Sequence, residues 1–181
     1  MHGYSLAGFT VLLYPSCESR PFAVFSKLWR EKNEKENAFG CFPDMLPTEA
    51  EWEYACRAGT TTPFSTGDNI TTSQANYDGN YPYNNFSKGT NRKSTTDVGS
   101  FPPNSWGLYD MHGNVYEWCW DWYGDYSTSA QADPRGPASG SERVIRGGSW
   151  EHYGWYVRSA YRSNGDLSSG WSSVGFRVVR N

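Results

Sequence analysis

The alternation of apolar and polar positions predicts several short strands and little other regular structure. Residues 115–123 alternate at strand spacing, so this strand presents two different faces. Apolar stretches at 6–14, 143–150 and 174–180 predict further strands, and residues 151–173 have no period and predict an irregular insertion. The faces of 115–123 hold Val115, Glu117, Cys119, Asp121 and Tyr123 on one side, and Tyr116, Trp118, Trp120 and Trp122 on the other.

One helix has clear start and stop signals. Thr48 and Glu51 have the spacing of a capping box, in which the hydroxyl accepts from the backbone three residues on and the carboxylate reaches back to the cap. Gly59 supplies the stop signal. We expect a helix from Thr48 to Gly59, anchored to the core by Trp52. Its apolar positions at helical spacing are Ala50, Tyr54 and Ala55.

The composition favours a single domain with an aromatic core. The 181 residues include 9 Trp, 13 Tyr and 9 Phe, and each ring buries roughly 150–250 Å². The 19 Gly and 10 Pro predict many turns. Residues 60–104 are polar and without period, so we expect a long loop pinned by rings. Those rings are Phe64, Tyr77, Tyr81, Tyr83, Phe86 and Phe101.

Charge and hydropathy argue against two classes of partner. A net charge of −3 and the lack of a basic run argue against nucleic-acid binding, and no segment approaches the length needed for membrane insertion. The run 6–14, followed by Cys17, has some features of a lipoprotein signal. No Lys or Arg precedes it, however, so we interpret it as a buried strand.

The four cysteines are widely spaced and form no pair typical of a zinc site. Buried thiols are the favoured interpretation, and disulfides are the alternative. The four positions are Cys17, Cys41, Cys56 and Cys119.

Four blocks of sequence carry a resemblance to a known family. Residues 46–55, 104–118, 143–150 and 174–180, in that order, resemble the formylglycine-generating, sulfatase-modifying family. The resemblance implies one α+β domain of C-type-lectin-like, formylglycine-generating-enzyme type, with few regular elements and long loops. It covers residues 46–181, whereas 1–45 match the family poorly.

The resemblance implies a calcium site in the block around the Gly113-Asn114 turn. The matching family positions bind calcium through one Asp or Asn side chain, two main-chain carbonyls and a Glu, a donor set that suits a hard cation. Carried over, the ligands are Asp110, Gly113, Val115 and Glu117. The alternative is that the two carboxylates cap a turn and pair with arginines. A second family calcium position is half supported, by Asn76.

The resemblance also argues against the chemistry of the family. Its enzymes hold copper with two thiolates five residues apart, just after the Gly147-Gly148-Ser149 block. Here those positions are His152 and Val157. Thiolates suit Cu(I), one imidazole cannot replace two of them, and valine has no ligand atom. We therefore expect neither bound copper nor oxidase activity.

Residues 151–173 have the composition of a binding loop. Tyr and Trp give contact area at small entropy cost, and Ser, Gly and Asn give adaptable hydrogen bonds. The alternative is a solvated loop with a few ring anchors. The expected ligand-binding residues are His152, Tyr153, Trp155, Tyr156, Tyr161, Ser163, Asn164, Asp166, Ser168, Trp171 and Ser172.

A narrower resemblance is to the variable proteins of diversity-generating retroelements, which diversify this same block by adenine-directed mutation. Mutated AAC codons never yield Trp or Glu, so Glu151, Trp155 and Trp171 would be fixed positions. Residues that fit such codons are His152, Tyr153, Gly154, Tyr156, Ser163, Asn164, Gly165, Asp166, Ser168, Ser169, Gly170, Ser172 and Ser173.

The sequence thus predicts a non-catalytic ligand-binding protein that displays this loop on a lectin-like scaffold. A protein or a surface glycan is the expected ligand, the protein is expected to be a monomer or small oligomer, and a cell-surface or secreted location follows from that role. A structural relative without a ligand is the main rival. Four arginines are expected to pair with the acids of 110–121 and to stack on tryptophans: Arg146, Arg158, Arg162 and Arg177.

Overall fold

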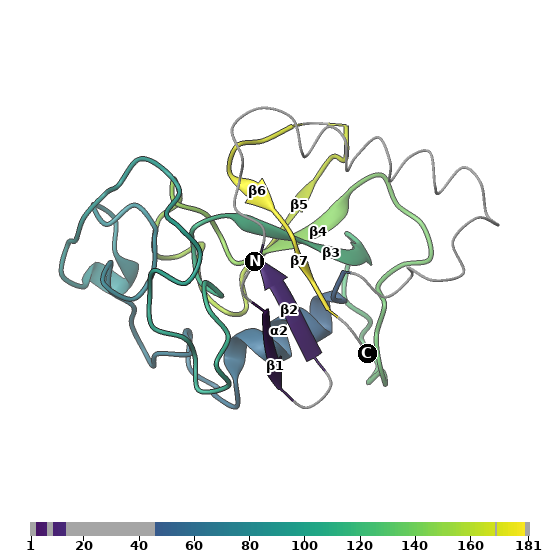
Figure 1. Cartoon of the computed structure of the whole chain (residues 1–181). Helices are drawn as coiled ribbons and strands as arrows, with labels where there is room; N and C mark the ends of the chain where they lie inside the picture. Colours follow the sequence, from purple (N-terminus) through teal and green to yellow (C-terminus); the bar gives the residue numbers. More distant parts are fainter. Residues whose placement is uncertain (1–2, 7–8, 14–45, 169, 180–181) are drawn as a thin grey trace.

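The computed structural model describes residues 3–6, 9–13, 46–168 and 170–179, in which loops outweigh regular elements. Figure 1 shows two small sheets beside one helix, with long loops to one side. The elements are β1 (Gly3–Leu6), β2 (Phe9–Leu13), α2 (Glu49–Arg57), the 3-10 helix η1 (Tyr83–Asn85), β3 (Tyr116–Trp122), β4 (Arg143–Arg146), β5 (Arg162–Gly165), β6 (Val174–Gly175) and β7 (Arg177–Val178).

The larger sheet has the strand order β5-β4-β3-β6 and the smaller one β1-β2-β7. β4 pairs antiparallel with both β3 and β5, whereas β6 runs parallel to β3. β7 pairs antiparallel with β2, which joins the start of the chain to its end. No described helix is long and apolar enough to span a membrane.

The larger sheet separates two cores, as the alternation in residues 115–123 predicts. Cys119 and Val144 pack with Trp52 of α2 on one face. The other face has its own buried cluster, formed by Leu46, Tyr116, Trp118, Ile145 and Val174. Both faces of β3 are covered, so most of its side chains are buried.

A third cluster pins the long loop of residues 60–104 to the segment after β4. Phe64 and Tyr77 are fully buried there against Val157, with Ile70 and Ala75 between them. This confirms the expected role of these two rings. Tyr81 and Phe86 differ, because their side chains are 53% and 41% exposed. The Phe86 ring faces solvent, whereas Tyr81, although exposed, stacks on Tyr153 of the segment after β4.

The helix begins as predicted. Thr48 accepts from the Glu51 amide at 3.2 Å, and the Glu51 carboxylate accepts from the Thr48 amide at 2.8 Å, which completes the capping box. The stop differs slightly from the prediction, because Ala58 takes the left-handed C-cap conformation one residue before Gly59.

Trp52 anchors α2 in the core as predicted, but the rest of its buried stripe differs from the prediction. Tyr54 and Ala50 are exposed, whereas Glu49, Trp52 and Cys56 are buried at helical spacing. The physical reason is that β4 and β5 present arginines to this face, and the helix supplies the opposite charges. Cys56 and Cys119 are buried free thiols, as predicted. Cys17 and Cys41 lie outside the described residues.

Several predicted strands were too long, and one strand was missed. β4 ends at Arg146 because Gly147 and Gly148 have φ of 95° and 73°, outside the strand region. The run 174–180 divides into β6 and β7, which belong to different sheets. β5 lies inside the segment predicted to be irregular. Of the run 6–14, Leu6 ends β1 and residues 9–13 form β2.

Candidate functional site

A buried ion pair holds the centre of the scaffold. The Glu117 carboxylate accepts from the Arg177 guanidinium at 2.6 and 2.7 Å, and the Trp52 indole Nε1 donates to it at 2.6 Å. The side chains of Arg177 and Glu117 are 3% and 5% exposed. This pair confirms that Arg177 pairs with an acid of the 110–121 block.

A second set of ion pairs fixes β4 and β5 to the helix. Arg162 binds the Glu49 carboxylate at 2.8 and 2.7 Å, and Arg146 binds Glu53 and stands 3.5 Å from Glu49. Arg146 and Arg162 are directly opposite each other on neighbouring strands, where like charges repel. The helix carboxylates neutralise that repulsion. The prediction that these two arginines pair with the 110–121 block is therefore wrong.

Stacking completes these contacts. Arg146 lies over the Trp52 ring at 5.3 Å and Arg158 over the Trp155 ring at 4.0 Å, as expected. Arg162 stacks on tyrosines instead, at 4.6 Å from the Tyr123 ring centroid and 4.2 Å from that of Tyr126.

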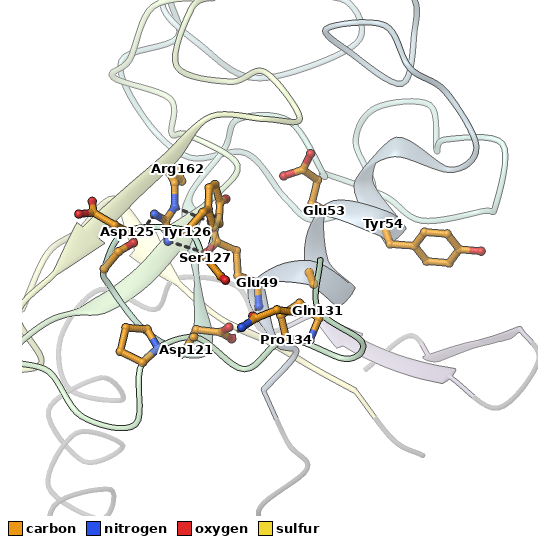
Figure 2. A pocket seen from close by; sticks show the side chains of 14 residues that line it. Glu49, Glu53, Tyr54, Asp121, Asp125, Tyr126, Ser127, Gln131, Pro134 and Arg162 are labelled. Atoms are coloured by element: carbon orange, nitrogen blue, oxygen red, sulfur yellow. Dashed lines mark hydrogen bonds and ion pairs between the residues drawn. The ribbon is translucent and has the colours of Figure 1, made fainter. Parts of the chain in front are cut away.

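A pocket of about 550 Å³ opens beside this ion-pair set, between the first half of α2 and the loop after β3 (Figure 2). Asp121 lines it and accepts from the Glu49 amide at 2.8 Å, so this carboxylate caps the helix from outside. Tyr126 donates to Glu49 at 3.0 Å. Glu49, Arg162 and Asp121 are thus engaged in bonds within the protein, which favours a structural role for this part of the pocket.

The predicted calcium ligands run from the segment before β3, which holds Asp110, Gly113 and Val115, to Glu117 within β3, and two of them are committed to other bonds. Asp110, in a left-handed conformation, accepts from the Gly99 amide at 2.7 Å through Oδ2, while its buried Oδ1 has no hydrogen-bond partner. Glu117 is engaged with Arg177 and Trp52. Burial raises the pKa of Asp110. Asp110 therefore offers an oxygen suited to a hard cation, and Glu117 would have to share its carboxylate.

The environment of the turn adds one more oxygen. The buried Oδ1 of Asn76 has no hydrogen-bond partner, while Asn76 Nδ2 donates to the side-chain Oδ1 of Asn114 at 3.2 Å. Among the described residues, no three His, Cys, Asp or Glu side chains gather as metal ligands. A calcium site here would therefore depend on backbone carbonyls as well, and it stays a prediction.

The predicted ligand-binding segment begins with two groups of rings in contact, Tyr81–Tyr153–Tyr156–His152 and Tyr83–Trp155. We define the aromatic surface as Tyr81, Tyr83, His152, Tyr153, Trp155 and Tyr156. Tyr153 stacks on Tyr81 with ring centroids 4.1 Å apart and contacts Tyr156 at 6.0 Å. Tyr156 in turn meets His152 at 5.4 Å. Trp155, 51% exposed, stacks on Tyr83 at 5.4 Å.

The remaining predicted residues do not all join this surface. The Tyr161 ring lies 5.0 Å from that of Tyr156, and it packs against the buried cluster that contains Trp118 and Ile145. Ser163 is paired with Ile145 on the same face. Asn164 is paired with Val144, which faces α2, and it donates to Glu142 at 2.6 Å. Asn164 therefore lies on the other face of the sheet.

The end of the segment is exposed and separate from the rings. Asp166 accepts from the Ser168 amide at 2.7 Å, and Trp171 is 40% exposed. Ser172 is exposed beside it. Trp171 approaches β5 closely, because a side chain added at Gly165 would meet its ring at 2.8 Å.

The two positions that carry thiolates in the family have different surroundings here. His152 is half-buried, and its Nδ1 lies 2.7 Å from the Ser149 hydroxyl. Burial lowers the pKa of His152, which favours a neutral ring. Val157 is fully buried in the third cluster. Position 157 is thus occupied by an ordinary core residue.

Two kinds of residue were not predicted as part of the site. Tyr81 and Tyr83, expected to pin the long loop, also contact the predicted binding segment. Glu49 and Glu53 carried no prediction of their own. The available signal was their spacing: Glu49 and Glu53 are four residues apart on one side of the helix, next to the buried Trp52, which favours pairing with arginines of the core.

Comparison with known proteins agrees with this architecture. Residues 28–181 match the family of the sulfatase-modifying factor enzyme 1-like domain. The chain is 44% identical over 141 residues to serine/threonine-protein kinase pkn1 of Chlamydia pneumoniae, and 39% identical over 143 residues to formylglycine-generating enzyme of Mus musculus. These matches cover 75% and 74% of this chain, but 21% and 38% of the relatives.

A solved structure shows the same fold. Treponema denticola variable protein 1 matches with a TM-score of 0.62 and 40% identity, over 75% of this chain and 46% of that protein. The chain therefore spans less than half the length of these three relatives. Together the matches confirm the predicted α+β, C-type-lectin-like fold of the formylglycine-generating type.

Proposed function

The chain belongs to the sulfatase-modifying factor enzyme 1-like family, and within it we propose that the chain is a non-catalytic ligand-binding protein. The aromatic surface and the exposed end of residues 151–173 would contact the ligand, and the sheet and helix would hold them in place. The likeness to a variable protein supports this proposal, because that protein shares both the fold and 40% of the aligned residues.

One observation carries the proposal. Val157 stands where the resemblance places one of two copper-binding thiolates, and it is fully buried among apolar side chains. Cu(I) is a soft ion that the family binds with two thiolates, and the Val157 side chain has no atom that could replace the second thiolate. The same segment instead exposes Tyr153 and Trp155, side chains that are enriched at binding surfaces.

Other parts of the proposal follow from the binding role. The ligand would be a protein or a surface glycan, the chain would act as a monomer or small oligomer, and it would work at the cell surface or outside the cell. Calcium at Asp110, Glu117 and the main-chain carbonyls of Gly113 and Val115 would neutralise the unpartnered Asp110 oxygen and stiffen this segment.

A copper assay separates binding from catalysis. The purified chain is mixed with Cu(I), oxygen and a cysteine-containing sulfatase peptide, and formylglycine is measured by mass spectrometry. No turnover is expected from this chain, while a formylglycine-generating enzyme converts the peptide in the same buffer. Copper-dependent turnover by the folded chain would overturn the proposal.

Sequencing tests the display role. The 3′ end of the gene is compared across independent isolates of its source. Variation confined to codons 151–173, at adenine-derived positions and sparing Trp155 and Trp171, is expected of a diversified protein. An invariant segment would leave a binder of fixed specificity or a structural relative.

A further inference from the structure

We propose that residues 78–83 form a fixed half of the ligand surface, with Tyr81 as a specificity-determining residue outside the segment 151–173. This inference rests on the proposed binding function and deepens it. The segment after β4 lies beside the long loop in Figure 1, and rings from both meet at the aromatic surface.

The two strips of chain are joined through their backbones. The Asp78 amide donates to the His152 carbonyl at 2.9 Å, and the Gly154 amide donates to the Tyr81 carbonyl at 2.9 Å. Both bonds are made by groups that every non-proline residue carries, so a change of side chain at 152 or 153 leaves them intact. The relative position of the two strips is therefore independent of the side chains they display.

Gly154 shows how close this contact is. A Cβ added there would stand 2.5 Å from the backbone nitrogen of Tyr83 and 3.1 Å from the Pro82 carbonyl carbon. Backbone atoms cannot move aside as a flexible side chain can. Gly154 fits the codon pattern for diversification, but the structure requires glycine at this position. Gly170 fits the same pattern and has open space around it.

Tyr81 has the features of a ligand contact. Its side chain is 53% exposed and stacks on Tyr153, whose side chain is 44% exposed, at a tilt of 35°. A ligand resting on Tyr153 would therefore also touch Tyr81. Because tyrosine has few rotatable bonds, it gives contact area at little entropic cost. Variation at 153 would change one half of this contact while Tyr81 stays the same.

A displayed library provides the test. Codons 153 and 156 are randomised in the full chain, and folded members are selected for binding to hen egg-white lysozyme as a probe. Tyr81→Ala is then introduced into several selected binders. Tyr54→Ala is the matched control, because Tyr54 is 69% exposed on α2 and outside the aromatic surface.

The expected result is a loss of affinity of at least about tenfold for Tyr81→Ala, with unchanged affinity for Tyr54→Ala. Binders that tolerate Tyr81→Ala as well as the control would overturn the inference and keep the proposed function. A folded library that yields no binder would instead count against the proposed function itself.

A glycine pair tests the backbone contact without any ligand. Gly154→Ala is expected to lower the melting temperature clearly, and Gly170→Ala is expected to leave it unchanged. Amide hydrogen exchange at residues 78–83 should also become faster in Gly154→Ala alone. Equal behaviour of the two variants would show that the two strips are not held together as proposed.

Discussion

The contact between the larger sheet and α2 and the aromatic surface are stabilised by different kinds of interaction. On the helix side of the larger sheet, specific charged side chains meet in pairs, such as the buried pair Arg177–Glu117 and the partly buried pair Arg162–Glu49. At the aromatic surface, backbone hydrogen bonds join the two strips, and the side chains of Tyr81, Tyr153 and Trp155 are exposed. The first arrangement depends on the identity of each residue, and the second largely does not.

This difference explains how one domain can be rigid and adaptable at the same time. A change in a buried pair leaves an uncompensated charge, whereas a change in an exposed ring removes only that ring's contacts. The fold therefore places its tolerance to substitution where a ligand would bind.

The greatest loss of stability is expected from Arg177→Met. Glu117 would then remain buried with no cation beside it, at a cost of about 3–5 kcal/mol in the free energy of unfolding. Arg158→Met is the matched control, because Arg158 stacks on the exposed Trp155, and about 1 kcal/mol or less is expected there. Urea unfolding measures both, and equal losses would contradict the division between the two regions.

A pH effect is expected from His112. Burial lowers the pKa of this imidazole from 6.5 to about 4, and its Nδ1 lies 2.8 Å from the Val157 carbonyl. Below pH 6.5 the unfolded chain binds a proton that the folded chain does not. The free energy of unfolding should therefore fall as the pH drops from 6.5 to 4, by up to roughly 3 kcal/mol.

His112→Gln isolates this contribution. Burial raises the pKa values of Asp110 and Asp121, so these carboxyls stabilise the fold on acidification and act in the opposite direction. The quantity to compare is thus the difference between wild type and His112→Gln at pH 7 and at pH 4.5. If this difference is the same at both pH values, His112 does not titrate as described.

A smaller effect is expected at the helix start. Thr48→Ala removes the hydroxyl that accepts from the Glu51 amide, which typically costs about 1 kcal/mol. Thr61→Ala changes an exposed threonine outside the helix and should have almost no effect. Chemical denaturation of both variants checks this. An equally small change in Thr48→Ala would mean that tertiary contacts alone fix the start of α2.

The smallest change in stability is expected at the aromatic surface. Tyr153→Ala removes a ring that is 44% exposed, and the free energy of unfolding should fall by less than about 1 kcal/mol. Tyr77→Ala removes a fully buried ring and should cost about 3–5 kcal/mol. Thermal melting compares the two, and similar losses would show that Tyr153 serves the fold rather than the surface.

Local signals were predicted well because they depend on neighbours in the chain. The capping box joins residues three positions apart, and the alternation in β3 reflects the pleat of a single strand. β5 escaped prediction because Arg162, Ser163, Asn164 and Gly165 have no strand pattern of their own. These residues form a strand because β4 offers an open edge and Glu49 holds Arg162.

The sequence alone determined the family fold, the start of the helix, the two faces of β3 and the presence of His152 and Val157 at the thiolate positions. Contacts in the folded protein determine which acid each arginine meets, that Asn164 faces away from the rings, and that Tyr81 lies against Tyr153. The reason is physical: the first group follows from residue types and short spacings, whereas the second requires contacts between segments that only folding brings together.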